Sequence, residues 1–140
     1  MPILQGMCSS FKQESWLGLH DLDTNVIKMA LYTASANLSQ ATTEYNVSTA
    51  GQVSGTGYTA GGVTLTNVQV LLSGTTAYVT FDNPVWSGAS FTCRGALIYN
   101  ASQGNRAIAV LDFGSDKTAS GNFTVQLPAA TATTALLRFA

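Results

Sequence analysis

Several segments of this chain alternate hydrophobic and polar residues with a period of two, which is typical of half-buried β-strands. The segment 76–81 is the clearest case, because Ala77 and Val79 alternate there with threonine and tyrosine. In the segment 91–99 the apolar side chains would share one face, with Arg94 on the opposite face. Residues 26–32 form a nearly unbroken apolar run, which is also predicted as a strand, with Ile27, Met29 and Leu31 on one face. The other segments predicted as strands are 63–65, 68–72, 76–81, 91–99, 107–113, 123–127 and 136–139.

Turn-forming residues separate these segments. Gly, Ser and Asn cluster at 73–74, 102–105 and 114–122, and such clusters mark turns between strands. Many short strands with frequent turns are typical of a β-sandwich or a β-barrel. The pattern therefore predicts one all-β domain over residues 1–140, an antiparallel β-sandwich of the jelly-roll or immunoglobulin-like (Ig-like) kind with one short N-terminal helix.

That helix is predicted over residues 10–20. Ser10 is followed three residues later by Gln13, which is the spacing of a capping box, and Glu14 falls in the first turn. A further short helical turn is predicted within 39–45. The residues expected on the buried stripe of the helix are Cys8, Phe11, Ser15 and Leu19, with Trp16 and Leu17 widening the contact.

Charged side chains are absent from two long stretches, 45–81 and 118–137. Only 9% of the chain is charged, against about a quarter of a typical soluble protein. A surface so poor in charge gives little protection against self-association. The composition therefore favours a protein that packs against copies of itself or against a larger assembly, and it leaves few ionisable groups for catalysis or metal binding. We expect the surface of 45–80 and 118–137 to be buried in subunit contacts, because depletion of charge marks the centre of an interface.

Composition also argues against several partners. Hydrophobic residues make up 46% of the 140 residues, which is enough for one packed domain. The net charge of −1 comes from scattered residues, and without a Lys/Arg cluster nucleic acid is a poor partner. No apolar run approaches the roughly 18 residues that cross a membrane. Residues 1–6 lack the basic and apolar regions of a secretory signal, so we expect synthesis in a reducing cytoplasm.

Synthesis in a reducing cytoplasm has consequences for the cysteines and for the glycosylation motifs. Cys8 and Cys93 are most simply two buried thiols, and a disulfide between them is the alternative. Without secretion, the Asn-x-Ser/Thr motifs carry no glycans. Those motifs begin at Asn37, Asn46, Asn100 and Asn122.

Two short motifs resemble nucleotide-handling sequences. Gly55-Thr56-Gly57-Tyr58-Thr59-Ala60 matches the dinucleotide fingerprint, but a β-branched strand follows where a helix N-terminus is required. We interpret this motif as a glycine-rich turn between strands. Asp112-Phe113-Gly114 copies the magnesium-binding triplet of protein kinases without the other kinase motifs. Here Asp112 is expected to end a strand and Gly114 to form the turn.

Two further groups of residues could in principle form a metal site or a catalytic nucleophile. Asp21-Leu22-Asp23-Thr24-Asn25 opens like a calcium loop, but Val26 and Tyr32 occupy the positions of the required Gly and Glu, which favours a capped turn. His20 and Cys93 are the one conceivable base–nucleophile pair. Cys93 would lie on an apolar strand face, where a thiol is normally inert. His20 is expected at the surface, near the C-terminus of the helix.

Aromatic residues are the last candidates. Tyr58, Tyr78 and Trp86 could stack against a sugar, or they could belong to the core or to a subunit contact. No cluster of Asp, Asn or Gln accompanies them. We therefore assign no catalytic, cofactor-binding or metal-binding residue.

A set of segments spread over most of the chain carries a family resemblance. They are Ser10-Phe11-Lys12-Gln13-Glu14, Ile27-Lys28-Met29-Ala30-Leu31-Tyr32-Thr33, Thr43, Tyr45, Val53-Ser54-Gly55-Thr56-Gly57-Tyr58-Thr59-Ala60-Gly61-Gly62, Phe81-Asp82-Asn83-Pro84-Val85-Trp86, Ala96-Leu97-Ile98-Tyr99-Asn100 and Ala107-Ile108-Ala109-Val110-Leu111-Asp112-Phe113-Gly114. Together they resemble small structural proteins of tailed-bacteriophage virions. The resemblance implies a particle component and brings no catalytic residue with it. Cys93 stands where a small residue such as Ala would be expected.

The charge-poor surface and this resemblance lead to the same expectation. We expect a non-enzymatic bacteriophage virion structural protein, a capsid decoration or cement protein that stabilises the head lattice. It would be located in the virion after synthesis in the host bacterial cytoplasm, and its partners would be the major capsid protein, other virion subunits and copies of itself. The alternatives are a tail, collar or baseplate component and, in a different class, a carbohydrate- or receptor-binding β-sandwich module.

Overall fold

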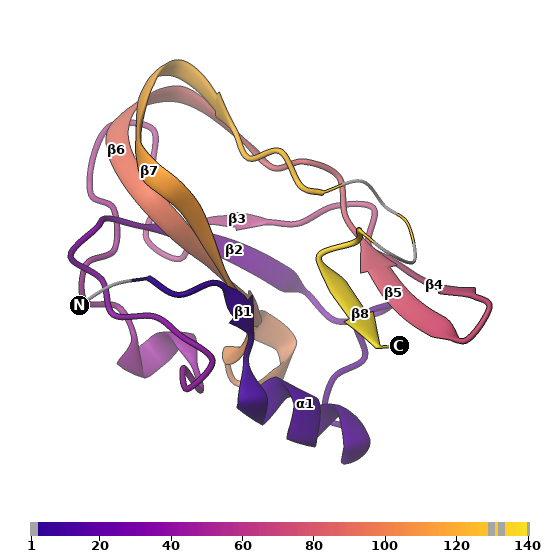
Figure 1. The fold of residues 1–140 in the computed structure, drawn as a ribbon. Coiled ribbons are helices and arrows are strands. Elements are labelled where there is room, and N and C mark those ends of the chain that lie inside the picture. The colour runs from indigo at the N-terminus through magenta and orange to yellow at the C-terminus, as the bar shows by residue number, and fades with distance from the viewer. Residues whose placement is uncertain (1–2, 129–130, 132–133, 140) are drawn as a thin grey trace.

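The computed structural model describes residues 3–128, 131 and 134–139 of the chain (Figure 1). These residues form two antiparallel sheets and one α-helix, which confirms the prediction of a mostly antiparallel β fold with an N-terminal helix. The larger sheet has the order β1-β7-β6-β2-β3, and the three-stranded sheet has the order β4-β5-β8. The strand bounds are Gly6–Met7 (β1), Ile27–Tyr32 (β2), Val63–Thr64 (β3), Gln69–Ser73 (β4), Thr76–Thr80 (β5), Val85–Asn100 (β6), Arg106–Thr124 (β7) and Leu137–Phe139 (β8).

The two longest strands, β6 and β7, form a single bent hairpin that arches over the molecule (Figure 1). The sequence predicted two separate strands, 107–113 and 123–127, with a turn at 114–122 between them. This is wrong, because β7 continues through the predicted turn. β6 likewise begins at Val85, well before the predicted start at residue 91.

The turn signal in β7 belongs to a bulge. Cys93 pairs with Lys117, but Gly95 pairs with Asp112, so several residues of β7 face one residue of β6. Gly114 lies in this bulge with a φ of 83°, a left-handed conformation that other residues rarely adopt. The same glycine that would permit a turn therefore permits the hairpin to bend without ending.

β2 lies between β6 and β3 and is buried on both faces. The sequence predicted that Ile27, Met29 and Leu31 share one face of this strand, and all three side chains are buried. Ala30 and Tyr32, which point the other way, are fully buried as well. A central strand that is covered on both faces is apolar on both faces, so its sequence is a continuous apolar run. Residues 26–32 have this pattern.

The helix α1, Ser9–Trp16, is shorter than predicted. It ends in a Schellman motif, in which the N–H of Gly18 donates to the C=O of Ser15 (3.2 Å) and the N–H of Leu19 donates to the C=O of Glu14 (3.0 Å). Gly18 has a φ of 74°, the left-handed conformation that this motif requires. Gly18 was therefore the sequence signal for the end of the helix.

The start and the faces of α1 also differ from the prediction. Cys8 is the N-cap residue and no side chain caps the helix, so the capping box at Ser10 is wrong. Strand β1 leads directly into the helix and sets where it begins. Trp16 is 90% exposed and Leu17 is 67% exposed, so the predicted wider contact is also wrong. Phe11 is the side chain of α1 that enters the apolar core.

The predicted helical turn at 39–45 is only partly in place. A hydrogen-bonded turn closes from Ser39 to Thr42, and a short 3-10 helix, Tyr45–Val47, begins at the end of the predicted segment. The Thr42 hydroxyl accepts a hydrogen bond from the Ser39 N–H, which favours the turn over a continuing helix.

Candidate interaction site

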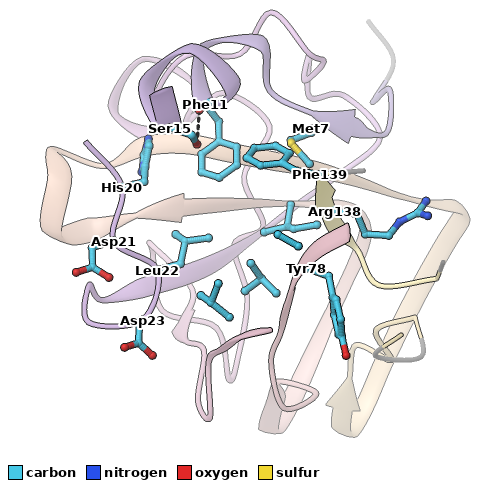
Figure 2. Close-up of a pocket in the computed structure, with 14 residues that line it drawn as sticks. Met7, Phe11, Ser15, His20, Asp21, Leu22, Asp23, Tyr78, Arg138 and Phe139 are labelled. Atoms are coloured by element: carbon cyan, nitrogen blue, oxygen red, sulfur yellow. Dashed lines mark hydrogen bonds between the residues drawn. The ribbon is translucent and has the colours of Figure 1, made fainter. Parts of the chain in front are cut away.

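A pocket of about 470 Å³ lies between α1, the loop that follows it and the three-stranded sheet (Figure 2). Its volume falls within the range of about 300–1,000 Å³ that is common for ligand sites. Asp21, Asp23 and Arg138 lie at its margin (Figure 2). The apolar side chains that line it include Phe11, Leu22, Val70, Val79, Leu137 and Phe139.

One face of the three-stranded sheet forms the floor of this pocket. The register places Val79 of β5 opposite Val70 of β4 on one side and opposite Leu137 of β8 on the other. The alternation seen in the sequence therefore selects the side chains that face the pocket. At one end, the Phe139 ring lies 6.3 Å from the Phe11 ring, which brings β8 and α1 together.

The β4–β5 hairpin extends away from the larger sheet (Figure 1). Every residue of β4 is exposed, and the exposed fraction is 49% for Val70 and 73% for Leu72. β4 is also the edge strand of its sheet. Apolar edge strands are usually protected by a charge or a proline, and β4 carries neither. The molecule therefore presents an apolar, charge-free strand edge.

This hairpin lies within the charge-free stretch 45–81 that the sequence analysis marked as an assembly surface. The other stretch, 118–137, includes residues 129–130 and 132–133, which lie outside the described residues. Burial of either stretch in subunit contacts stays a prediction.

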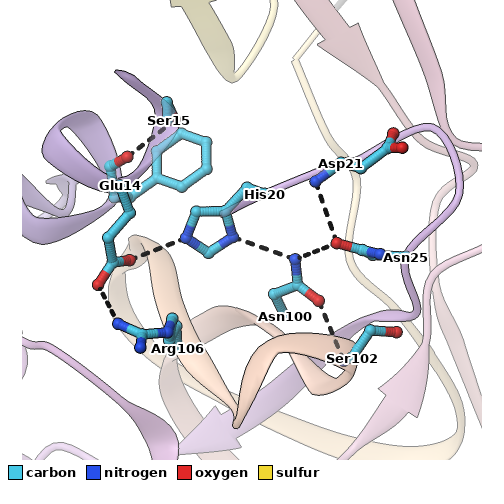
Figure 3. A network of polar contacts seen from close by, with 9 residues as sticks. Glu14, Ser15, His20, Asp21, Asn25, Asn100, Ser102 and Arg106 are labelled. Carbon is cyan, nitrogen blue, oxygen red and sulfur yellow. Dashed lines mark hydrogen bonds and ion pairs between the residues drawn. The ribbon is translucent and has the colours of Figure 1, made fainter. Parts of the chain in front are cut away.

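A buried polar network lies beside the pocket (Figure 3). Asn100 is fully buried, and its Oδ1 accepts a hydrogen bond from the Ser102 N–H (3.0 Å), which fixes the orientation of the amide. The Asn100 Nδ2 then donates to Asn25 Oδ1 (2.9 Å) and to His20 Nδ1 (3.1 Å). Because His20 Nδ1 accepts, its Nε2 carries the proton and donates to Glu14 Oε1 (2.8 Å).

The network connects α1 to the turn of the long hairpin. The second carboxylate oxygen of Glu14 accepts a hydrogen bond from Arg106 Nη1 (2.7 Å). The His20 ring lies 4.8 Å from the Phe11 ring, and the His20 side chain is 1% exposed. The prediction of a surface histidine is therefore wrong. The chain reverses at Gly18 and returns the imidazole against the inner face of the helix.

The two cysteines are free thiols buried in the core. Burial raises the pKa of both Cys8 and Cys93 from 9.0 to about 12, so each thiol stays protonated and is a poor nucleophile. Glu14 and Asn100 occupy the two ring nitrogens of His20. The candidate pair of His20 and Cys93 therefore does not form.

The glycine-rich segment 55–60 is a loop that leads into strand β3, as predicted, but the element before it is the 3-10 helix Tyr45–Val47 and not a strand. No helix follows it to receive a pyrophosphate. The side chain of Gln52 holds the loop in place, because its Oε1 accepts hydrogen bonds from the Tyr58 hydroxyl (2.7 Å) and the Gly61 N–H (2.8 Å). These contacts give the segment a structural role.

The two acidic motifs also have structural roles. Asp112 Oδ1 accepts hydrogen bonds from the Gly114 N–H (2.9 Å) and Arg94 Nε (3.3 Å), so it stabilises the bulge. The prediction that Asp112 ends a strand is wrong, because β7 continues beyond it. The Asp21 N–H donates to Asn25 Oδ1 (3.0 Å), which confirms the capped turn. Within the described residues, no three His, Cys, Asp or Glu side chains gather in a way that could hold a metal ion.

The three aromatic candidates do not form one exposed platform. Trp86 is 3% exposed, and its ring lies 6.1 Å from that of Phe123. Tyr58 is half-buried, and its hydroxyl accepts a hydrogen bond from the Leu31 N–H. Tyr78 is half-buried on β5, where it borders the pocket. Two of the three therefore belong to the interior of the fold.

The sequence did not predict the pocket or the network beside it. Glu14 and His20 lie six residues apart, Asn100 lies 80 residues beyond His20, and no motif links the three. The exposed edge of β4 is easier to anticipate than the pocket, because an apolar segment with no charge nearby is visible in the sequence. That edge is the feature the sequence analysis came closest to finding.

Comparisons of this chain with protein-family models, with curated proteins and with solved structures give no match. Among the helices of the described residues, none is long and apolar enough to span a membrane. The evidence for function therefore comes from the surface of the molecule and from the residues that form it.

Proposed function

We propose that this chain is a non-enzymatic structural protein of a tailed-bacteriophage virion, which binds the capsid as a decoration or cement protein. The observation that carries the proposal is the exposed, apolar and charge-free β4–β5 hairpin. Depletion of charge at the centre of a surface patch is the compositional mark of a protein interface. The resemblance of several segments to virion proteins supports the same kind of partner.

The proposed partners are the major capsid protein or other virion subunits, together with further copies of the chain. The protein would be made in the host cytoplasm and located in the virion. Buried thiols of raised pKa and a histidine with both ring nitrogens engaged support a role without catalysis.

The proposal extends to the architecture, which we assign to an antiparallel β-sandwich. Leu137 of the smaller sheet belongs to the same buried cluster as Met29 and Leu97 of the larger sheet. Val79 packs against that cluster from β5. Side chains from both sheets thus share one core, as the layers of a sandwich do.

Binding to heads that lack this protein tests the proposal. Purified wild-type protein should bind such heads to a fixed ratio and raise the temperature at which they burst, because a ligand of the assembled state favours that state. Leu72→Glu should weaken binding by about tenfold or more, because it buries a charge in the contact. Its unfolding temperature should change little, because Leu72 is exposed.

A matched control adds the same charge elsewhere. Ser115 is exposed on the bulge of β7, outside the charge-free stretches, and Ser115→Glu should bind heads like the wild type. Retention of the protein by purified tails alone would replace the head assignment with the tail alternative. Retention by a polysaccharide in place of any virion part would replace it with the carbohydrate-binding module.

A further inference from the structure

We propose that two copies of this chain pair through β4, edge to edge and antiparallel, so that their two three-stranded sheets join into one. This inference deepens the proposed assembly role by naming the strand and the partner. It concerns the isolated chain, so it is tested without any particle.

The hairpin geometry shows which main-chain groups of β4 are free to pair. β4 and β5 are joined by the two-residue turn Gly74-Thr75, and Gly74 has a φ of 60°. In such a hairpin the residues that flank the turn exchange both main-chain hydrogen bonds, and bonded pairs recur at every second position. Leu71 therefore directs its N–H and C=O toward β5. Val70 and Leu72 direct theirs toward the free edge.

These outward groups are symmetric about Leu71, which makes the edge complementary to itself. When two β4 strands lie antiparallel with Leu71 opposite Leu71, Val70 of each copy faces Leu72 of the other. Both of those pairs can then exchange their main-chain hydrogen bonds. A two-fold axis through the Leu71 pair relates the copies, as an isologous interface requires. The same axis keeps the apolar faces of both sheets on one side.

Charge does not oppose this contact. The segment 45–81 has no charged side chain, and the whole chain has a net charge of only −1. Like charges opposite one another would destabilise a strand pair, and here there are none. The side chains brought together are exposed in the single chain, at 49% for Val70, 39% for Leu71 and 73% for Leu72. Pairing would remove this apolar surface from water.

The pairing would also affect the pocket. Val70 lines the pocket and sits opposite Leu72 of the other copy in the register described above. A second copy would therefore place an apolar side chain beside the open side of the cavity. The pocket and the edge are in this way parts of one surface.

Sedimentation of the purified chain over a range of concentrations tests the pairing, and we expect a shift from monomer to dimer. Leu71→Lys and Leu71→Glu each place like charges opposite one another at the axis. Each variant alone should remain monomeric at concentrations where the wild type is a dimer. Mixed in equal amounts, the two variants should form a dimer again. Ser115→Lys adds the same charge on the exposed bulge and should dimerise like the wild type.

Amide hydrogen exchange provides a second readout at residue level. The Leu71 amide should be protected at every concentration and in every variant, which reports an intact hairpin. The Val70 and Leu72 amides should become protected only where the dimer is populated. A wild type that is monomeric throughout, a Leu71→Lys chain that dimerises alone, or a dimer with unprotected Val70 and Leu72 amides would each overturn the inference.

Failure of this inference and failure of the particle proposal can be told apart. A wild type that stays monomeric yet saturates heads overturns the β4 pairing and supports the decoration role. A β4 dimer that does not bind any virion part supports the pairing and overturns the decoration role.

Discussion

At the scale of single residues, Gly62 packs against the main chain of β2 too closely to leave room for a side chain. A Cβ atom added there would lie 1.7 Å from the carbonyl oxygen of Met29, and Gly62 has a φ of 81°. The loop is held at this distance from β2, because the Tyr99 hydroxyl donates a hydrogen bond to the C=O of Gly61 (2.6 Å). Backbone conformation and space therefore both require glycine at this position.

Comparison of Gly62→Ala with Gly18→Ala separates the effect of backbone conformation from the effect of limited space. We expect Gly62→Ala to lower the free energy of unfolding by about 3 kcal/mol or more, because the loop must move away from β2. Gly18 has a similar φ of 74° but nothing within 4 Å of the added atom, so Gly18→Ala should cost only about 1 kcal/mol. Urea unfolding of both variants measures the difference. Equal losses would show that conformation alone explains the glycine.

Buried thiols and phenols make stability depend on pH at the alkaline side. Burial raises the pKa of Cys8 and Cys93 from 9.0 to about 12, and it raises the pKa of Tyr99 from 10.0 to about 12. Burial also raises the pKa of Tyr32 and Tyr58. Each group is neutral when protonated, so the folded state favours the protonated form.

The free energy of unfolding should therefore fall as pH rises from about 9 to about 12. In that range the unfolded chain has already lost these protons and binds fewer than the folded chain, which gives a negative slope of stability against pH. Below about pH 9 the contribution is fully present. Urea midpoints measured from pH 8 upward check the slope, and Cys93→Ala should make it shallower. A stability that stays level to pH 11 would contradict the burial of these groups.

At the scale of elements, the sequence predicted the short strands better than the two long ones. β4 and β5 lie within a residue or two of their predicted bounds, because alternation and the Gly74 turn are local signals. The continuous β7 was missed, because a glycine such as Gly114 suits a bulge as well as a turn. Pairing with β6 decides between them, and that pairing is not visible in the local sequence.

The parts of the candidate site also differ in how far the sequence predicts them. The exposed edge of β4 lies within the charge-free stretch 45–81, so composition directed attention to this part of the surface. The network of Glu14, His20 and Asn100 could not be predicted, because it forms only when α1 packs near the turn of the long hairpin. The prediction that Glu14 lies in the first turn is wrong, because α1 begins at Ser9 and places Glu14 beyond that turn, where it is buried.

That network should be essential to the attachment of α1. Asn100→Ala would leave the Ser102 N–H, Asn25 and His20 without their shared partner, so we expect a loss of about 3 kcal/mol in the free energy of unfolding. Asn37 begins the same type of sequence motif but is exposed, and Asn37→Ala should change stability by less than about 0.5 kcal/mol. Thermal unfolding of the two variants makes the comparison. A small loss at Asn100 would mean that the network contributes little.

At the scale of the whole molecule, charge and apolar surface are distributed unevenly. The ion pairs of the described residues, such as Arg94 with Asp112 and Arg106 with Glu14, connect elements within the fold. The β4–β5 hairpin offers apolar groups and main-chain hydrogen bonds. A molecule of this kind would bind its partners through contacts that salt screens weakly.

Binding to virion heads should accordingly be almost independent of sodium chloride concentration. Screening at roughly 0.1 M salt already reduces interactions between charges more than about 10 Å apart, so an electrostatically held partner would dissociate as salt rises. For this protein we expect the dissociation constant for heads to change by less than about threefold between low and high sodium chloride. Sulfate should strengthen binding, because it favours the burial of apolar surface. Titration of depleted heads with labelled protein in each salt measures both effects. A steep loss of affinity in sodium chloride would show that the few charged residues, and not the β4–β5 hairpin, make the contact.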